Sequence, residues 1–363
     1  MKRFFASCML ALAGMVLLAP VAKAEPYLAV RTGLKCAQCH VNPTGGGLRT
    51  PFGNIYAQTQ LAAQRLGPED EPWTGMIGRF LAVGGNLRAN ANGVRVPHQK
   101  DTSEFAVEEA RVFLDASLIP NRLSFYVDER VAPGTAQNME ANVRLWVREG
   151  SFYVKAGQMY LPFGFRFEDD NAFVRQLSGI NMQTPDRGVE VGIEHGNISA
   201  QLAVSNGSGG GPETDNGKEV TASAAYVKSA WRVGASALFN NSDAGNFSGA
   251  ALFSGVRLGQ FSLLGELDFI KDESLGPNVR KQVATLAEVD WLARQGHNIK
   301  LTHEWFEPDR DVSNDEQTRT SLLYEYSPVQ FVQFRAGVRL YDGIPQSDLQ
   351  NRTQAFLQLH GFF

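Results

Sequence analysis

Residues 332–340 read VQFRAGVRL, and apolar and polar side chains alternate along this stretch. In a β-strand, successive side chains point to opposite faces of the sheet, so Phe334 and Val338 share one face. Arg335 and Arg339 share the other face. The sequence therefore predicts a strand with one apolar and one charged surface, as a strand between lipid and a water-filled lumen requires.

The same alternation recurs in sixteen segments between residues 77 and 363. Short turns such as Glu149-Gly150 alternate with long polar connections such as residues 206–217. This alternation is typical of outer-membrane barrels, and a soluble β-sandwich would not show it. We therefore predict an all-β fold, a 16-stranded antiparallel transmembrane β-barrel over residues 76–363.

The N-terminus has the features of a secretory signal. Lys2 and Arg3 precede an apolar stretch, and Ala22-Lys23-Ala24 is a small-x-small cleavage site. These features predict a signal peptide over residues 1–24 and export from the cytoplasm, with an uncleaved membrane anchor as the alternative. After residue 24 there is no apolar run of about 20 residues, so no transmembrane helix is expected. A barrel in the outer membrane of a Gram-negative bacterium, surrounded by its lipid, satisfies these constraints.

The composition limits the classes of binding partner that we expect. The formal charge of −4 and the pI near 5.9 give no reason to expect nucleic acid. The mean hydropathy of −0.21 is compatible with a barrel, because transmembrane strands alternate apolar and polar residues.

Residues 36–40 read CAQCH, which is the attachment motif of c-type haem. Cys36 and Cys39 would bond to the two vinyl groups of the porphyrin, and His40 would be the proximal iron ligand. The alternatives are a redox-active thiol pair and half of a zinc site. No βαβ pattern surrounds the pair, and residues 25–75 contain no second His. We predict one covalent haem c in a small helical segment over residues 25–75.

The sixth ligand of such a haem is less defined by the sequence. Met76 is the one Met or unused His inside or next to the segment, and Met ligation would raise the reduction potential. The alternatives are an apolar role for Met76 at the membrane rim and an open or water-bound site. A short helix is expected after Asn54, over about residues 55–66, with Leu61 and Leu66 facing the porphyrin.

The inward faces of the predicted strands carry many charges. We expect these basic residues to line the pore: Arg122, Arg130, Arg144, Arg148, Lys155, Arg335 and Arg339. Acidic residues concentrate on the eleventh to fourteenth predicted strands: Glu266, Asp268, Glu288, Asp290, Glu304 and Glu325. Facing walls of opposite charge would set a field across the pore, whereas the alternative is a polar, solvated lining.

The connection over residues 161–186 is rich in apolar residues, including Phe163 and Phe165. Because such a loop would not remain in water, we predict that it folds into the lumen; the alternative is an ordinary capping loop. Its acidic triplet, Glu168-Asp169-Asp170, either attracts cations such as ferrous iron or pairs with the luminal arginines.

Residues 29–40, together with Phe52-Gly53, resemble the start of the fused monohaem cytochrome–porins known from iron-oxidising bacteria. Residues 157–164 and the loop after them resemble the phosphate-selective porins O and P. The resemblance implies a haem relaying electrons between an extracellular donor or acceptor, such as iron, and a periplasmic c-type cytochrome. Lys35 and residues 42–47 depart from the pattern of the iron oxidisers, which leaves the donor open.

Three functions therefore compete. The first is an electron carrier, with iron:cytochrome c oxidoreductase activity as its enzymatic form. The second is an anion-selective solute porin with a haem-bearing plug, and either form could be a homotrimer as many porins are. The third is a haem enzyme such as a peroxidase, which needs an acid–base group beside the iron. Residues 25–75 offer no distal His for that role.

Overall fold

The computed structural model describes residues 25–68, 71–180, 184–274 and 279–363. The predicted signal peptide, residues 1–24, lies outside the described residues. No helix in the described ranges is long and apolar enough to cross a membrane.

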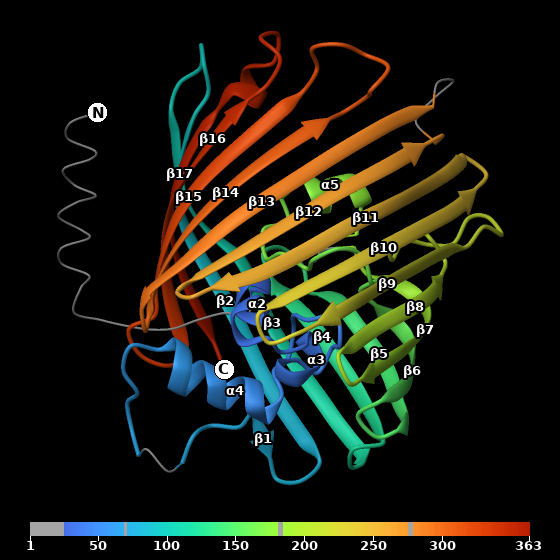
Figure 1. Cartoon of the computed structure of the whole chain (residues 1–363), viewed down its shortest axis with the longest axis vertical. Helices are drawn as coiled ribbons and strands as arrows, with labels where there is room; N and C mark the ends of the chain where they lie inside the picture. Colours follow the sequence, from blue (N-terminus) through green and yellow to red (C-terminus); the bar gives the residue numbers. More distant parts are fainter. Residues whose placement is uncertain (1–24, 69–70, 181–183, 275–278) are drawn as a thin grey trace.

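Sixteen long antiparallel strands form a closed ring within the described part of the chain (Figure 1). Each strand pairs with its neighbour in sequence, and the last pairs with the first long strand to close the ring. All sixteen predicted strands coincide with observed ones, so the prediction of a 16-stranded antiparallel barrel is confirmed. Their bounds are β2 Leu81–Arg95, β3 Thr102–Ile119, β4 Leu123–Ala132, β5 Gln137–Arg148, β6 Phe152–Met159, β7 Asp186–His195, β8 Ile198–Ser205, β9 Glu219–Val227, β10 Trp231–Ser242, β11 Gly245–Leu258, β12 Phe261–Asp272, β13 Arg280–Arg294, β14 His297–Glu307, β15 Gln317–Tyr326, β16 Val332–Asp342 and β17 Thr353–Phe362.

The outer face of the ring is apolar. On β11, outward-facing Leu252 is 57% exposed, whereas its inward-facing neighbour Ala251 is buried. Exposed aromatic side chains lie next to the short turns and pair across strands, as Tyr226 with Trp231 and Phe261 with Trp291 do. An apolar band bordered by aromatic rings is typical of barrels that sit in a membrane, with the rings at the interface.

A small helical segment precedes the ring and lies at its short-turn end (Figure 1). Its elements are α2 Pro26–Thr32, α3 Cys36–Cys39, α4 Pro51–Tyr56, the π-helical turn η1 Ala57–Leu61 and the two-residue strand β1 Met76–Ile77. Thr50 caps α4 by accepting a hydrogen bond from the Gly53 N–H (3.1 Å), and Pro51 follows at the first helical position. The prediction of a helix starting after Asn54 and reaching Leu66 is therefore wrong, because Thr50 and Pro51 start it earlier. Leu66 is exposed.

The N-terminal segment docks into the ring. α2 packs against β11 and β12, and its Val30 is 1% exposed. The packing is close, since a Cβ on Gly255 would lie 2.4 Å from Val30 Cγ2. At the other end of the segment, the Ala63 N–H donates to Ser327 O in the β15–β16 turn (2.7 Å). The segment therefore fills part of the short-turn mouth.

The long β6–β7 connection fills much of the remaining lumen. Its helix α5 (Phe173–Ser178) lies inside the ring and contacts β12, β13 and β14 (Figure 1). Glu266 on β12 accepts a hydrogen bond from the Phe165 N–H (2.7 Å), and Glu304 on β14 accepts one from the Phe173 N–H (2.9 Å). The prediction that this loop folds inward is confirmed for its described residues, and we call residues 160–180 and 184–185 the inward loop.

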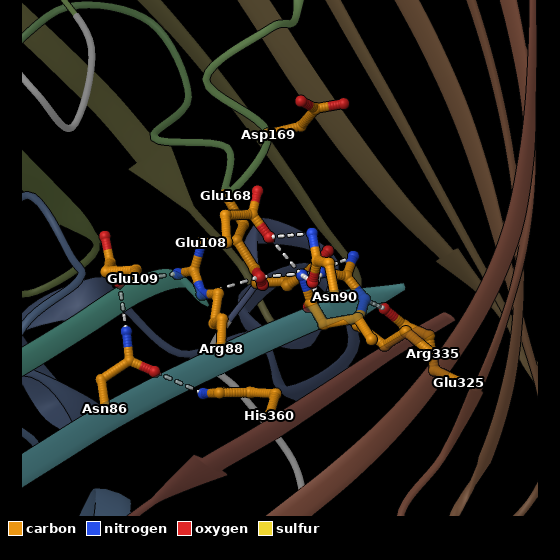
Figure 2. A network of polar contacts seen from close by, with 12 residues as sticks. Asn86, Arg88, Asn90, Glu108, Glu109, Glu168, Asp169, Glu325, Arg335 and His360 are labelled. Atoms are coloured by element: carbon orange, nitrogen blue, oxygen red, sulfur yellow. Dashed lines mark hydrogen bonds and ion pairs between the residues drawn. The ribbon is translucent and has the colours of Figure 1, made fainter. Parts of the chain in front are cut away.

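Arg335 on β16 joins the three parts of the interior. Its guanidinium contacts Glu25 of the N-terminal segment (3.0 Å) and Glu168 of the inward loop (2.7 Å). It also contacts Glu325 of the barrel wall (3.1 Å). Arg88 on β2 approaches Glu168 from the other side, within the polar network drawn in Figure 2. One buried cation therefore holds carboxylates from three separate regions of the chain.

We predict that Arg335→Met lowers the free energy of unfolding by about 3–5 kcal/mol, because it leaves buried carboxylates without their cation. Urea unfolding in detergent, followed by tryptophan fluorescence, measures the change. Arg148→Met is the matched control, since Arg148 is exposed, and it should change stability by less than about 0.5 kcal/mol. Equal stability of the two variants would contradict a structural role for Arg335.

Candidate functional site

The three residues of the predicted haem motif line one cavity. Cys36, Cys39 and His40 face it from the N-terminal segment, while the inward loop and the strands β8 to β11 provide the other walls. The walls are largely apolar and aromatic, and include Leu28, Tyr56, Leu61, Phe163, Phe165 and Phe253. The motif thus opens into a largely apolar chamber inside the barrel.

Local structure holds the motif in one orientation. Cys36 and Cys39 occupy the single turn of α3, where residues three apart share a face. Thr50 fixes the turn, since its N–H donates to Cys39 O (3.0 Å) and its hydroxyl to Gln38 O (2.7 Å). A Cβ on Gly53 would lie 2.2 Å from Cys39 O, so α4 packs against the motif only because residue 53 is glycine.

His40 is chemically suited to bind a metal. Its side chain is buried, and no atom of the described residues hydrogen-bonds to its Nδ1. Burial, reinforced by the nearby cations Arg49 and Arg166, lowers the pKa of His40 to about 3. The imidazole is therefore neutral at physiological pH, which is the form that coordinates metal ions.

The two thiols fit covalent attachment better than redox exchange. Cys36 and Cys39 are not joined by a disulfide. Burial raises the pKa of both thiols, that of Cys39 to about 11. A redox-active pair requires a lowered pKa, because the thiolate is the reactive form. Within the described ranges, no group of three or more His, Cys, Asp or Glu residues is arranged to hold a metal ion. Two free thiols, a neutral imidazole and an apolar chamber are the groups that a c-type haem needs.

The segment after His40 is anchored to the barrel wall. Asn42 donates to Glu140 Oε1 on β5 (3.0 Å). Gly47 has a φ of 63°, and a Cβ there would lie 2.3 Å from the hydroxyl oxygen of Tyr126. Residues 42–47 therefore dock the motif on the strands β4 and β5.

Met76 lies in a different environment from the motif. It packs beside Leu48, Ala82 and Tyr126 in a small apolar cluster, and it is not among the residues that line the cavity. His40 is the one His in that lining, which includes no Met. Assignment of Met76 as the sixth ligand stays a prediction, and the observed packing corresponds to its alternative apolar role.

Four of the predicted pore-lining arginines point inward: Arg130, Arg144, Arg335 and Arg339. Arg122 and Arg148 do not lie along the luminal wall, and this is a correction. Arg122 is exposed in the turn before β4, where it donates to Val147 O (3.0 Å), and Arg148 ends β5 in an exposed position. The chain turns next to these residues, so both side chains lie at the rim of the barrel.

The predicted separation of charge into two walls is also wrong, because basic strands carry their own acids. Arg111 on β3 binds Asp128 on β4 through its Nε (2.8 Å). Lys155 on β6 similarly pairs with Glu190 on β7 (2.9 Å). The acidic residues that neutralise these strands stand at alternate positions on the same face, where the period-two pattern itself would place them. If acidic and basic residues of the inward faces are considered together, the sequence predicts these ion pairs.

The acidic triplet of the inward loop follows the pairing alternative. Glu168 contacts Arg88 and Arg335, and Asp169 contacts Arg319 (3.0 Å) and Arg339 (2.8 Å). These carboxylates tie the loop to the wall.

A second, polar cavity lies towards the long-loop end of the lumen and was not predicted. Glu168 and Asp169 of the inward loop face it, opposite amide and charged residues of β2, β3, β16 and β17. Its wall includes Arg88, Asn90, Glu108, Arg335, Arg339 and Gln358. No sequence motif marks this chamber, because strands far apart in the chain build it.

Comparison with known proteins supports the barrel fold. No protein-family model matches the sequence, and no curated protein matches it either. The barrel is similar to an anion-selective porin from Comamonas acidovorans (TM-score 0.61, 11% identity, covering 78% of this chain and 99% of that one). It is also similar to OprB of Pseudomonas putida (0.62, 11%, 78% and 94%). A third neighbour is the trimer form of OmpT, an outer membrane protein of Vibrio cholerae (0.57, 11%, 78% and 100%). At these identities the likeness establishes a porin-type fold.

Attachment of the inward loop should depend on pH through Asp169. Burial opposes ionisation of this carboxyl, but Arg319 and Arg339 outweigh it and lower its pKa to about 2. A group with a lowered folded-state pKa stabilises the fold above its unfolded value of 3.8, and loses that effect as the pH falls through about 2. We therefore predict that Asp169→Asn costs about 2 kcal/mol at pH 6 and little at pH 2.

Urea midpoints of Asp169→Asn and wild type at the two pH values test this prediction. Asp101→Asn is the control, since Asp101 forms an exposed ion pair with Arg95 (side chains 70% and 67% exposed), and it should have little effect at either pH. A cost of Asp169→Asn that is the same at pH 2 and pH 6 would show that charge pairing does not hold the loop.

Proposed function

We propose that this chain is an outer-membrane electron-transfer protein whose porin-like barrel carries one covalently attached haem c. The observation that carries the proposal is the convergence of Cys36, Cys39 and His40 on one apolar cavity inside the barrel. In this proposal the two thiols anchor the cofactor and His40 provides its proximal ligand. The haem supplies one-electron exchange.

The barrel positions and insulates that cofactor. The N-terminal segment and the inward loop both occupy the lumen, so the cavity lies inside the barrel wall and away from lipid. In outer-membrane barrels the short turns face the periplasm, which would place the motif near a periplasmic c-type cytochrome. The extracellular donor or acceptor, of which ferrous iron is one candidate, would act from the long-loop side. Assembly as a homotrimer, the form in which OmpT has been seen, would bury part of the apolar outer face.

Covalent haem is the first expectation to test. Co-expressed with the c-type haem maturation machinery, the wild-type chain should gain the mass of one haem, because each thiol adds across one vinyl group. The double variant Cys36→Ser/Cys39→Ser should gain none. Mass spectrometry of the denatured chains makes the measurement, since only covalently bound haem survives denaturation. A wild-type chain without added mass would contradict the proposal.

Electron relay is the second expectation, and it separates the proposal from the alternative function. In vesicles that enclose a soluble c-type cytochrome, external ferrous iron should reduce the enclosed protein through wild type and not through the double cysteine variant. Visible absorbance of the enclosed cytochrome reports the transfer.

The alternative is an anion-selective solute porin with a haem-bearing plug. The polar chamber lined by Arg88, Arg335 and Arg339 is the observation that favours it. Planar-bilayer recordings distinguish the two functions. Steady anion current without any reduction of the enclosed cytochrome would favour the porin, whereas reduction through a non-conducting protein would favour the relay.

A further inference from the structure

Four arginines in the haem-motif cavity lack carboxylate partners. Arg49, Arg166, Arg175 and Arg232 all line it, and none forms an ion pair with an acid of the described residues. Arg166 donates to Gly45 O (2.6 Å), Arg175 to Phe165 O (3.4 Å) and Arg232 to Leu34 O (2.6 Å). Arg49 lies over the ring of Phe362, 3.5 Å from its centroid. Neutral groups are thus the contacts that the chain itself offers these cations.

The rest of the lumen is built differently. The buried arginines Arg111, Arg319 and Arg335 each bind at least one carboxylate. In the haem-motif cavity, Glu25 is the one acid of the lining. Its carboxylate is already bound by Lys300 and Arg335. The lining of the cavity therefore carries four arginines without an ion-pair contact and one acid that is already paired.

A buried arginine without an ion-pair contact is costly. A buried cation without a counter-ion loses its hydration and gains little in return. Arg175 is 3% exposed, and its Nε has no hydrogen-bond partner among the described residues. Burial also lowers the pKa of Arg175 to about 10. Both properties are expected of a site whose anion is supplied by a ligand.

We propose that Arg166 and Arg175 of the inward loop, together with Arg49, bind the carboxylates of the cofactor that Cys36 and Cys39 anchor. This inference rests on the proposed function. A haem is an apolar ring with two propionate groups, and the cavity offers apolar walls together with free guanidinium donors. Guanidinium groups suit this role because their planar fork binds a carboxylate through two hydrogen bonds.

The proposal gives the inward loop a second role. Arg166 and Arg175 belong to the same connection that Glu168 and Asp169 tie to the barrel wall. The loop would therefore hold the cofactor from one side while α3 holds it covalently from the other. Barrel and haem segment would then form a single site, and neither would bind the cofactor in the same way alone.

The reduction potential of the haem tests the proposal in Arg166→Gln and Arg175→Gln. Removing a cation beside a propionate favours the oxidised haem, so the ratio of reduced to oxidised haem at a fixed potential should fall about tenfold, equal to about 59 mV for one electron. The propionate that loses its arginine should also titrate at a higher pH. The potential of the variants should then rise as the pH falls from 8 to 5, whereas that of wild type should stay nearly constant.

Two controls distinguish loss of the contact between arginine and propionate from a general disturbance of the structure. Arg175→Lys keeps the charge, so its potential should stay nearer to wild type than that of Arg175→Gln. Arg148→Gln removes an exposed rim arginine and should leave the potential unchanged. If Arg175→Gln does not fold, Arg166→Gln still decides, because it removes the other arginine of the inward loop that is proposed to bind a propionate.

A non-covalent assay tests the source of the anion. In the Cys36→Ser/Cys39→Ser background, added haemin should bind at least tenfold more tightly than its dimethyl ester, and Arg166→Gln/Arg175→Gln should remove this preference. Equal binding of haemin and its dimethyl ester would show that the arginines do not bind the propionates, and it would overturn the proposal.

Loss of haem attachment and loss of propionate binding give different results. A chain that carries covalent haem, but whose potential and pH dependence are unchanged in both glutamine variants, overturns this inference and leaves the proposed function standing. A chain without covalent haem overturns both.

Discussion

Backbone hydrogen bonding imposes the constraint on which the rest of this structure depends. A sheet that crosses lipid must leave no edge strand unpaired, so β17 has to return to β2. A ring of sixteen strands encloses more space than its own inward side chains fill. That space must hold water or further protein, and here the N-terminal segment and the inward loop enter it from separate parts of the chain. The site between them exists because the ring is closed and wide.

Filling a polar lumen with protein creates an electrostatic problem that charged pairs solve. Arg335 binds carboxylates from the N-terminal segment, the inward loop and the barrel wall, so one guanidinium group holds all three parts together. The cavity around His40 departs from this arrangement, since its arginines face apolar walls and backbone oxygens. The contrast between paired and unpaired cations separates the structural interior from the candidate binding site.

Much of the fold follows from local patterns in the sequence. Period-two alternation over VQFRAGVRL and its counterparts specified all sixteen strands, and the apolar content of residues 161–186 specified an inward loop. Pairing across the lumen could not be predicted in the same way, because Glu168 and Arg335 stand 167 positions apart. Arg122 and Arg148 were misplaced because a turn only one or two residues away moves a side chain from wall to rim. The CAQCH motif indicated its chemistry, whereas the cations around it come from the residues just before α4, the inward loop and β10 and carry no motif.

The most direct test of this account is a redox titration of the purified, detergent-solubilised chain, followed by visible absorbance, with ferrous iron then added to the oxidised form. The account predicts sharp low-spin c-type bands, a single one-electron transition and reduction by iron. A protein without haem absorption, or with a haem that iron leaves oxidised while the barrel conducts anions, would contradict it and leave a solute porin.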